Sequence, residues 1–324
     1  MEYRTIEEWC EILDSQRIPI TAKDRVEGPY PYYGANGIQD YVDDYIFDDE
    51  LVLLAEDGGN FGSKDRPIAY RVSGKCWVNN HAHVLKPKKD LDVDYLCYSL
   101  MFYNTNGLVN GATRQKLTQS TMRKMKIPYL EINKQREIVQ KIKKIESVLN
   151  YSNRQLDLLD ELIKARFVEM FGDPIYNTQN RPMTEFINVV KMQRGYDLPV
   201  QDRNHEGSVP VYGANGVLGY HDIAKISDGG IITGRSGTIG KVYLANKEYW
   251  PLNTSLFSIE TYGNNLIYLQ YLVTLYDLKR FVEGTGVPTL NRNMFHNKKI
   301  IEVPINEQNT FASFVEEIDK SGSN

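Results

Sequence analysis

Tyr-Gly-Ala-Asn-Gly stands at residues 33–37 and returns letter for letter at residues 212–216. A five-residue identity that contains two glycines is improbable by chance within one chain. From Trp77, which matches Trp250, the correspondence continues downstream at a constant separation. Solenoid repeats run at roughly 20 to 50 residues, and this period is several times longer, so it indicates a duplicated domain.

Each copy has the pattern of a mixed α+β domain. Glycines separate short β-type runs, and a helix is expected near Tyr95 in the first copy and near Tyr268 in the second. We predict a first domain at residues 1–132 and a second at residues 174–304. The expected strands are Leu51–Ala55, Ile68–Val72, His81–Leu85, Gly230–Thr233, Lys241–Leu244 and Leu256–Ile259.

A single long helix is expected between the copies. Asn133 is a candidate N-cap, and Phe171-Gly172-Asp173-Pro174 supplies a glycine and a proline that end helices. Between these limits apolar side chains recur at alternating steps of four and three, which is typical of a coiled-coil seam. Residues 133–173 are therefore predicted to form a spacer helix. Eight of the ten seam positions are apolar, and the other two are Ser152 and Arg166; the apolar members are Ile138, Ile142, Ile145, Leu149, Leu156, Leu159, Ile163 and Met170.

The second copy contains the start of an equivalent helix at residues 305–324. Phe311, Val315 and Ile318 are the counterparts of the first three seam positions, at the separation that relates Trp77 to Trp250. About half of this second helix is missing relative to the first, so we expect its three apolar side chains to face only the first half of the long helix. Self-association or a partner protein should then cover the rest of the seam. The uncovered residues would be Leu156, Leu159, Ile163 and Met170.

The composition is that of a folded protein with two domains. Of 324 residues, 41% are hydrophobic and 11% aromatic, which is enough for two cores and excludes a disordered chain. No apolar run is long enough for a membrane helix, and Met1–Cys10 carries three glutamates where a signal peptide would carry cations. Three cysteines without a Cys-x-x-Cys pair indicate a reducing compartment. These features predict a soluble, cytoplasmic protein.

The net charge of −4 conceals an uneven distribution. Asp40–Asp57 holds eight acidic residues and no basic one, whereas Tyr95–Leu130 holds five basic residues and no acidic one. The acidic run is typical of a solvated surface. The basic run is either an ordinary charged surface or a contact for phosphates. A nucleic-acid partner is therefore compatible with the acidic total.

Catalytic and metal-binding motifs are weak. Gly234–Lys241 resembles a phosphate-binding loop, but its spacing is one residue too long and Val242 replaces the magnesium-binding hydroxyl. The sequence lacks the motifs of zinc proteases, α/β-hydrolases, dinucleotide-binding folds and amino-methyltransferases. An enzyme with an unrecognised site remains an alternative. Cys76, His81, His83 and Cys97 could be imagined as a metal-binding cluster. The second copy has no such residues at the corresponding positions, so we expect no metal centre there.

The polar positions of the two copies favour DNA binding. The repeated turn places a ring and an amide beside flexible backbone, although it also suits a plain tight turn before a strand. Two later loops, which begin at Gly111 and Gly284, combine hydroxyls, amides and cations, the groups that contact phosphates and base edges. The predicted contacts of the first copy are Tyr33, Asn36, Lys64, Arg66, Arg114, Gln115, Lys116 and Arg123. Those of the second copy are Tyr212, Asn215, Arg235, Ser236, Lys241, Thr289, Asn291, Arg292 and Asn293.

Together these features resemble the specificity subunit of bacterial type I restriction–modification enzymes. The resemblance spans the whole chain, because Tyr-Gly-Ala-Asn-Gly, Ile-Asn-x-Gln (residues 132–135 and 305–308) and a heptad helix follow one another in both copies. It implies two target recognition domains that each read one half of a split sequence in double-stranded DNA. It also implies that the helices form an antiparallel coiled coil on which two modification subunits dock.

The same resemblance implies a chain without catalytic activity. In that family the modification subunits bind S-adenosylmethionine and methylate adenine, and the restriction subunit joins the complex through them. The chain is therefore expected to hold no cofactor of its own. Its short second helix departs from the family pattern. A protein–protein scaffold, with paired binding domains and a dimerising helix, is the alternative interpretation.

Overall fold

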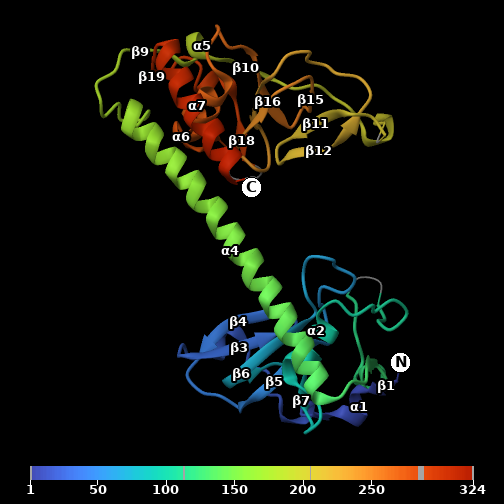
Figure 1. Cartoon of the computed structure of the whole chain (residues 1–324). Coiled ribbons are helices and arrows are strands. Elements are labelled where there is room, and N and C mark those ends of the chain that lie inside the picture. The colour runs from blue at the N-terminus through green and yellow to red at the C-terminus, as the bar shows by residue number, and fades with distance from the viewer. Residues whose placement is uncertain (1, 112–113, 205, 284–287, 323–324) are drawn as a thin grey trace. The chain divides into compact units, whose positions relative to one another are not determined.

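The computed structural model describes residues 2–111, 114–204, 206–283 and 288–322 (Figure 1). The chain folds into two compact units, residues 1–150 and 151–324. Each has the mixed α+β architecture that the repeat predicts. Gly284, the start of the second predicted loop, lies outside the described residues. In the described part of the chain no helix is long and apolar enough to cross a membrane.

The first unit is built on a six-stranded sheet with the strand order β2-β7-β5-β6-β3-β4. Its pairs are antiparallel except β3 and β6, which run parallel and place Tyr32 opposite Trp77. The strands are β2 (Cys10–Ile12), β3 (Tyr30–Gly34), β4 (Gly37–Val42), β5 (Phe47–Ala55), β6 (Ala69–Val78) and β7 (Ala82–Pro87). The remaining elements are β1 (Tyr3–Thr5), α1 (Ile6–Trp9), α2 (Val93–Met101), α3 (Gln119–Arg123) and β8 (Lys126–Pro128).

The second unit repeats this sheet with one strand divided. Its orders are β10-β16-β13-β14 and β12-β11-β15, so β14 and β15 together correspond to β6. The parallel pair recurs, with Val211 opposite Trp250, which confirms the duplication. The strands are β10 (Lys191–Arg194), β11 (Val209–Gly213), β12 (Gly216–His221), β13 (Gly230–Gly234), β14 (Val242–Ala245), β15 (Trp250–Pro251) and β16 (Ser255–Glu260). Around them lie β9 (Met183–Glu185), α5 (Phe186–Val189), α6 (Leu266–Leu275), β17 (Val282–Glu283), β18 (Thr289–Leu290), β19 (Lys299–Ile301) and α7 (Ile305–Gly322).

The repeated Tyr-Gly-Ala-Asn-Gly motif forms the tight turn of a hairpin in both units, β3–β4 and β11–β12. Its last glycine has a positive φ, 97° at Gly37 and 91° at Gly216. A Cβ atom at Gly216 would lie 2.9 Å from the ring of Tyr243, and one at Gly37 would lie 3.6 Å from the ring of Tyr70. The glycine is therefore required by backbone conformation in both copies, and by close packing in the second.

The long helix is α4 (Ile132–Phe171). It ends just before Gly172 as predicted, but Asn133 lies within its first turn, so the assignment of Asn133 as the N-cap is wrong. Val139 belongs to the core of the first unit, whereas Ile163, Phe167 and Phe171 belong to the core of the second. The stretch between these anchors is exposed. Its large apolar side chains at the surface are Ile145, Val148, Leu149, Tyr151, Leu156, Leu158 and Leu162.

The expectation that the second helix faces the first half of the long helix is wrong. Phe311 of α7 packs against the last turns of α4, with its ring 5.3 Å from that of Phe167 and 5.7 Å from that of Phe171. Strand β9, just after α4, pairs with β19, just before α7, so the end of one helix lies beside the start of the other. Val315 and Ile318 belong to the same hydrophobic core as Ile163 and Met170. Ile163 is buried and Met170 is half-buried, so the expectation that they are uncovered is wrong.

Candidate nucleic-acid interface

In the first unit the acidic run and the basic loop meet. Strand β5 ends at Ala55, and the backbone amide of Leu117 donates to the carbonyl of the next residue, Glu56, at 2.7 Å. Asp57 and Lys116 form an isolated antiparallel bridge beside it. Lys116 and Leu117 are thus held beside the residues that follow the C-terminal end of β5.

Each predicted cation of this loop region has an acidic partner. Arg114 Nε lies 2.7 Å from Asp57 Oδ1, and Lys116 Nζ lies 3.1 Å from Glu56 Oε1. The side chains of Arg114 and Lys116 are still 59% and 50% exposed, and Gln115 between them is exposed. These groups can reach a ligand, but nearby carboxylates offset part of their charge. Arg123 is paired likewise, with Glu7 at 2.9 Å.

A buried polar network lies beneath this loop. His83 Nδ1 is 2.7 Å from Asp14 Oδ2, and His83 Nε2 is 2.9 Å from the carbonyl of Leu117. Arg17 Nη1 donates to Glu56 Oε2 at 2.7 Å, and Gln119 Nε2 donates to Asp14 Oδ2 at 2.8 Å. The network therefore joins strand ends that are far apart in the sequence to the basic loop.

Asp14 is ionised within this network. Burial alone would raise its pKa, but the hydrogen bonds and charge of His83, with those from Gln119 and the Val84 amide, outweigh burial and hold the pKa below its ordinary value. Asp14, Glu56 and His83 also have the donor atoms of a metal site, within 4.8 Å of one another. The guanidinium of Arg17 already supplies the compensating positive charge, so we assign the cluster to an ion-pair network.

The other predicted contacts of the first unit are spread over its surface. Asn36 is exposed, and its Nδ2 donates to the carbonyl of Gly58 at 3.0 Å. This bond ties the hairpin turn to the segment that follows β5. Lys64 lines a separate cavity of about 430 Å³. Arg66 is exposed on the same loop, where its amide donates to Ser63 Oγ at 2.9 Å.

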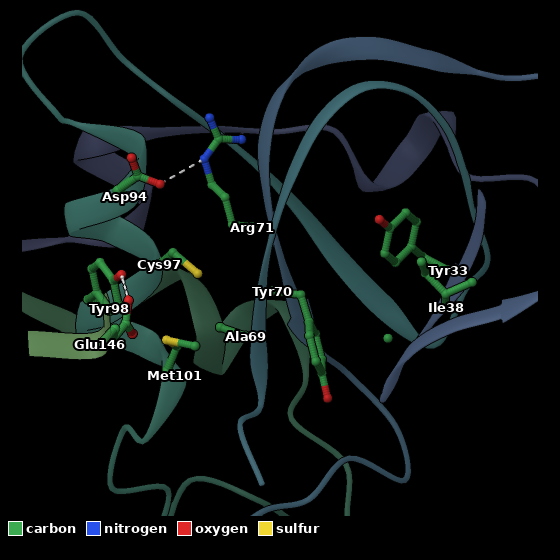
Figure 2. A pocket seen from close by; sticks show the side chains of 11 residues that line it. Tyr33, Ile38, Ala69, Tyr70, Arg71, Asp94, Cys97, Tyr98, Met101 and Glu146 are labelled. Carbon is green, nitrogen blue, oxygen red and sulfur yellow. Dashed lines mark hydrogen bonds and ion pairs between the residues drawn. The ribbon is translucent and has the colours of Figure 1, made fainter. Parts of the chain in front are cut away.

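Tyr33 lines a larger cavity, of about 570 Å³, between the sheet and helix α2 (Figure 2). Two pairs lie at its wall: Arg71 with Asp94, at 3.2 Å, and Tyr98 with Glu146, at 2.6 Å. The charged side chains that line this cavity thus have partners. The described lining residues are not arranged as a nucleophile or an acid–base pair. We assign this cavity no ligand.

The second unit has the same backbone frame with different side chains. The amide of Leu290 donates to the carbonyl of Arg235 at 2.8 Å, and Ser236 bridges to Thr289. Beside this frame lies a cavity of about 280 Å³, which we call the arginine cavity. Its lining brings five predicted contacts together and adds Arg194, which the sequence analysis missed; its members are Arg194, Arg235, Leu256, Thr289, Leu290, Asn291, Arg292 and Asn293.

Three predicted residues of the second unit lie elsewhere. Tyr212 is buried and packs edge-on against Tyr249, with ring centroids 5.7 Å apart, so it belongs to the core. Asn215 and Lys241 are exposed. Gly234–Lys241 connects two antiparallel strands, β13 and β14. A phosphate-binding loop would lead into a helix, so this segment is a hairpin loop.

Among the residues that the structure describes, Cys76 and Cys97 form no cluster with His81 and His83. Cys76 and Cys97 belong to different hydrophobic cores of the first unit. Burial raises the pKa of each thiol to about 12. Both are therefore packed, protonated thiols at neutral pH.

The sequence profile of the type I restriction modification DNA specificity domain matches residues 1–160 and 177–323. The chain belongs to this family. It is 27% identical over 340 residues to a protein of Haemophilus influenzae described as a type I restriction enzyme specificity subunit, covering 98% of this chain and 88% of that one. A type I specificity subunit of Mycoplasma pneumoniae is 22% identical over 312 residues, covering 90% and 82% of the two chains.

The fold of a solved family member is also similar. The crystal structure of the type I restriction–modification S subunit from M. genitalium gives a TM-score of 0.62 at 15% sequence identity. The match covers 99% of this chain and 90% of that one. At this identity the likeness concerns the fold, and it agrees with two mixed α/β domains and a long helix.

Proposed function

We propose that this type I specificity subunit recognises a bipartite target in double-stranded DNA, with each unit reading one half. The observation that carries the proposal is the matched pair of loop frames: Leu117 bonds to Glu56 as Leu290 bonds to Arg235. Two domains that read different sequences need similar backbone frames that carry different polar side chains. The chain itself is proposed to be non-catalytic.

The exposed part of α4 is the proposed docking surface for modification subunits. Ile145, Leu149 and Leu156 are 60%, 58% and 58% exposed on it. Large exposed apolar side chains gathered on one helix in this way mark a protein interaction site. We propose that the docked subunits bind S-adenosylmethionine, methylate adenine and bring in the restriction subunit. Self-association through the same side chains is the second use that this surface allows.

Selection from a random duplex pool tests the recognition step. The chain, alone and with its modification subunit, is mixed with the pool, and retained duplexes are sequenced. Two short conserved motifs at a constant gap would support the proposal. A retained pool without sequence preference would contradict it and favour a protein–protein scaffold. Methylated adenines in both motifs, mapped in cells that carry both genes, would support the role of the partner.

Exchange of one recognition domain tests the independence of the halves. Each unit has its own core, so replacing residues 1–131 with the equivalent domain of another family member should change one motif only. The other motif and the gap should stay as they were. A change in both motifs at once would overturn the two-reader proposal.

A further inference from the structure

The arginine cavity of the second unit occupies the place that the Asp14–Glu56–His83 network occupies in the first. Gly234 pairs with Ser255 across β13 and β16, as Ala55 pairs with Ala82 across β5 and β7. The next residue along each central strand is Arg235 in the second unit and Glu56 in the first. Arg235 and Glu56 are therefore structural equivalents, and they are as far apart in the sequence as the two copies of the repeated turn.

The edge strands give the second equivalence. In the second unit Arg194 pairs with Leu256 across β10 and β16. In the first unit the amide of Leu13 donates to the carbonyl of Val84, which continues the β2–β7 pairing and puts Asp14 beside His83. Arg194 thus corresponds to Asp14, and Leu256 to His83. Arg292 lies at the same separation from Gln119 as Trp250 from Trp77. The third arginine of the cavity therefore corresponds to Gln119 of the network.

The same place in the fold thus carries opposite charge in the two units. In the first unit Asp14 and Glu56 meet the guanidinium of Arg17 and the ring of His83, and Lys116 pairs with Glu56 from outside. In the second unit three arginines line the cavity, and no carboxylate is among the described residues that line it. Glu283 lies opposite Thr289 across β17 and β18, but it is exposed and does not line the cavity.

The surroundings of the arginine cavity are positive as well. Burial, together with the charges of Arg292 and Lys191, lowers the pKa of His296 to about 4, so this imidazole is neutral at pH 7. Cations that converge without acids repel one another and are stabilised by an anion. The amides of Asn291 and Asn293 add hydrogen-bonding groups at the same wall.

We propose that the arginine cavity binds one phosphodiester group of the DNA backbone, and that the first unit lacks this contact because Asp14 and Glu56 fill the equivalent place. The inference rests on the proposed function. A phosphate suits the cavity better than a base edge, because guanidinium groups bind phosphate oxygens with charge-assisted, often bidentate hydrogen bonds. One arginine suffices to read a guanine, whose edge carries no net charge.

The test combines protein variants with neutralised phosphates. Binding of the selected duplex is measured for the full chain and for the double variant Arg194→Gln/Arg292→Gln, over a range of salt concentrations. The double variant should bind at least about tenfold more weakly, and its salt slope should fall by about one, because the contact with one phosphate is lost. Arg154→Gln/Lys247→Gln removes two charges at exposed positions outside the cavity and should change the affinity less than twofold.

Methylphosphonate substitution then locates the phosphate. Each phosphate of the duplex is replaced in turn by an uncharged methylphosphonate. At one position in one half of the target the replacement should weaken the wild type but not the double variant, because the contact is already lost there. Arg194→Lys/Arg292→Lys keeps the charges and should retain most of the salt slope. This result also verifies that the cavity tolerates substitution.

Three outcomes would overturn the inference while leaving the proposed function intact. The first is wild-type affinity and salt slope in the double glutamine variant. The second is coupling of the variant to 7-deazaguanine at one base rather than to any methylphosphonate, which would make the cavity a base reader. The third is stabilisation of the DNA-free wild type against heat by submillimolar inorganic phosphate without methylphosphonate coupling, which would assign a free anion. If the wild type selects no DNA sequence, the proposed function itself fails.

Discussion

The side-chain oxygen of Gln135 accepts a hydrogen bond from the backbone amide of Asp92 over 2.8 Å. Its Nε2 donates to the carbonyls of Leu130 and Asp90, at 2.7 and 2.9 Å, and the residue is fully buried. One amide therefore ties the start of α4 to the start of α2, the helix that packs on the sheet. The second unit repeats this joint: Gln308 accepts from the backbone amide of Asn265 and donates to the carbonyl of Val303, and its third contact is with the side-chain oxygen of Asn264.

Replacing Gln135 with leucine should destabilise the first unit by about 2–4 kcal/mol, since buried backbone groups lose their partners. Urea unfolding of the full chain, followed by fluorescence, measures the change. Gln140→Leu is the matched control, because Gln140 is exposed on the same helix, and it should change stability by no more than about 0.5 kcal/mol. Equal effects of the two substitutions would contradict the assigned role of the joint.

Asp14→Asn should make the stability of the first unit depend less on pH. The folded-state pKa of Asp14 is lowered, so its contribution is fully present above the unfolded-state value of about 3.9 and is lost as the pH falls through the folded-state value. At pH 7 we expect a loss of about 2–3 kcal/mol. The gap between variant and wild type should narrow below about pH 4.

Urea unfolding at pH 7, 5 and 3 measures this profile. Asp65→Asn serves as the control at an exposed position of the same unit, and it should follow the wild type at each pH. A constant gap between Asp14→Asn and the wild type from pH 7 to pH 3 would mean that ionised Asp14 is not the source of the stabilisation.

Asp57→Asn should strengthen DNA binding. Asp57 holds Arg114 at 2.7 Å, and removal of this carboxylate frees the guanidinium and takes away a negative charge beside the DNA phosphates. We expect several-fold higher affinity and a salt slope steeper by up to about one. Asp48→Asn, at an exposed position of the same acidic run, should have a smaller effect, and higher affinity in both variants alike would point to net charge alone.

Arg114→Ala/Lys116→Ala should act in the opposite direction and weaken DNA binding. The loss should be about 1–3 kcal/mol for a side chain that is bidentate to a guanine, while loss of a phosphate contact should flatten the salt slope. Titration of the selected duplex at several salt concentrations gives both quantities. Unchanged affinity and slope in this double variant would remove the loop from the interface.

Leu149→Glu should prevent association through α4, because Leu149 is one of its large exposed apolar side chains and a buried, unpaired carboxylate is costly. Light scattering reports self-association, and co-purification reports binding of the modification subunit. Ser147→Glu, exposed on the opposite side of the same helix, should leave both unchanged. Association that survives Leu149→Glu would place the contact elsewhere on the chain.

The sequence predicted those elements whose signals are local or repeated. Asn133 and Phe171-Gly172-Asp173-Pro174 limit the long helix to within a residue or two of Ile132–Phe171. The repeat predicted two copies of one fold because it preserves the turn, the parallel pair and the glutamine joint. Each of these features recurs at a nearly constant separation, so a single chain is enough to find it.

The packing of α7 and the buried network could not be predicted in this way. The position of Phe311 beside Phe167 depends on the pairing of β9 with β19, two three-residue strands with little sequence signal. Asp14 and His83 are 69 residues apart and meet only after the sheet has formed. Arg194 could have been found, because it follows Asp14 at nearly the separation of the repeated turns. A comparison that looks for identical residues misses this pair, because the two side chains carry opposite charges.

That reversal has a consequence for how such proteins diversify. The backbone that surrounds Asp14 and Glu56 in one copy surrounds Arg194 and Arg235 in the other with the same strand pairing. The fold therefore accommodates, at the same position, either a network of internal ion pairs or a cavity lined by arginines. A few substitutions at this position can change what the domain recognises while the strand pairing is kept. Because the gene carries two copies of the domain, one copy can change while the other retains its function.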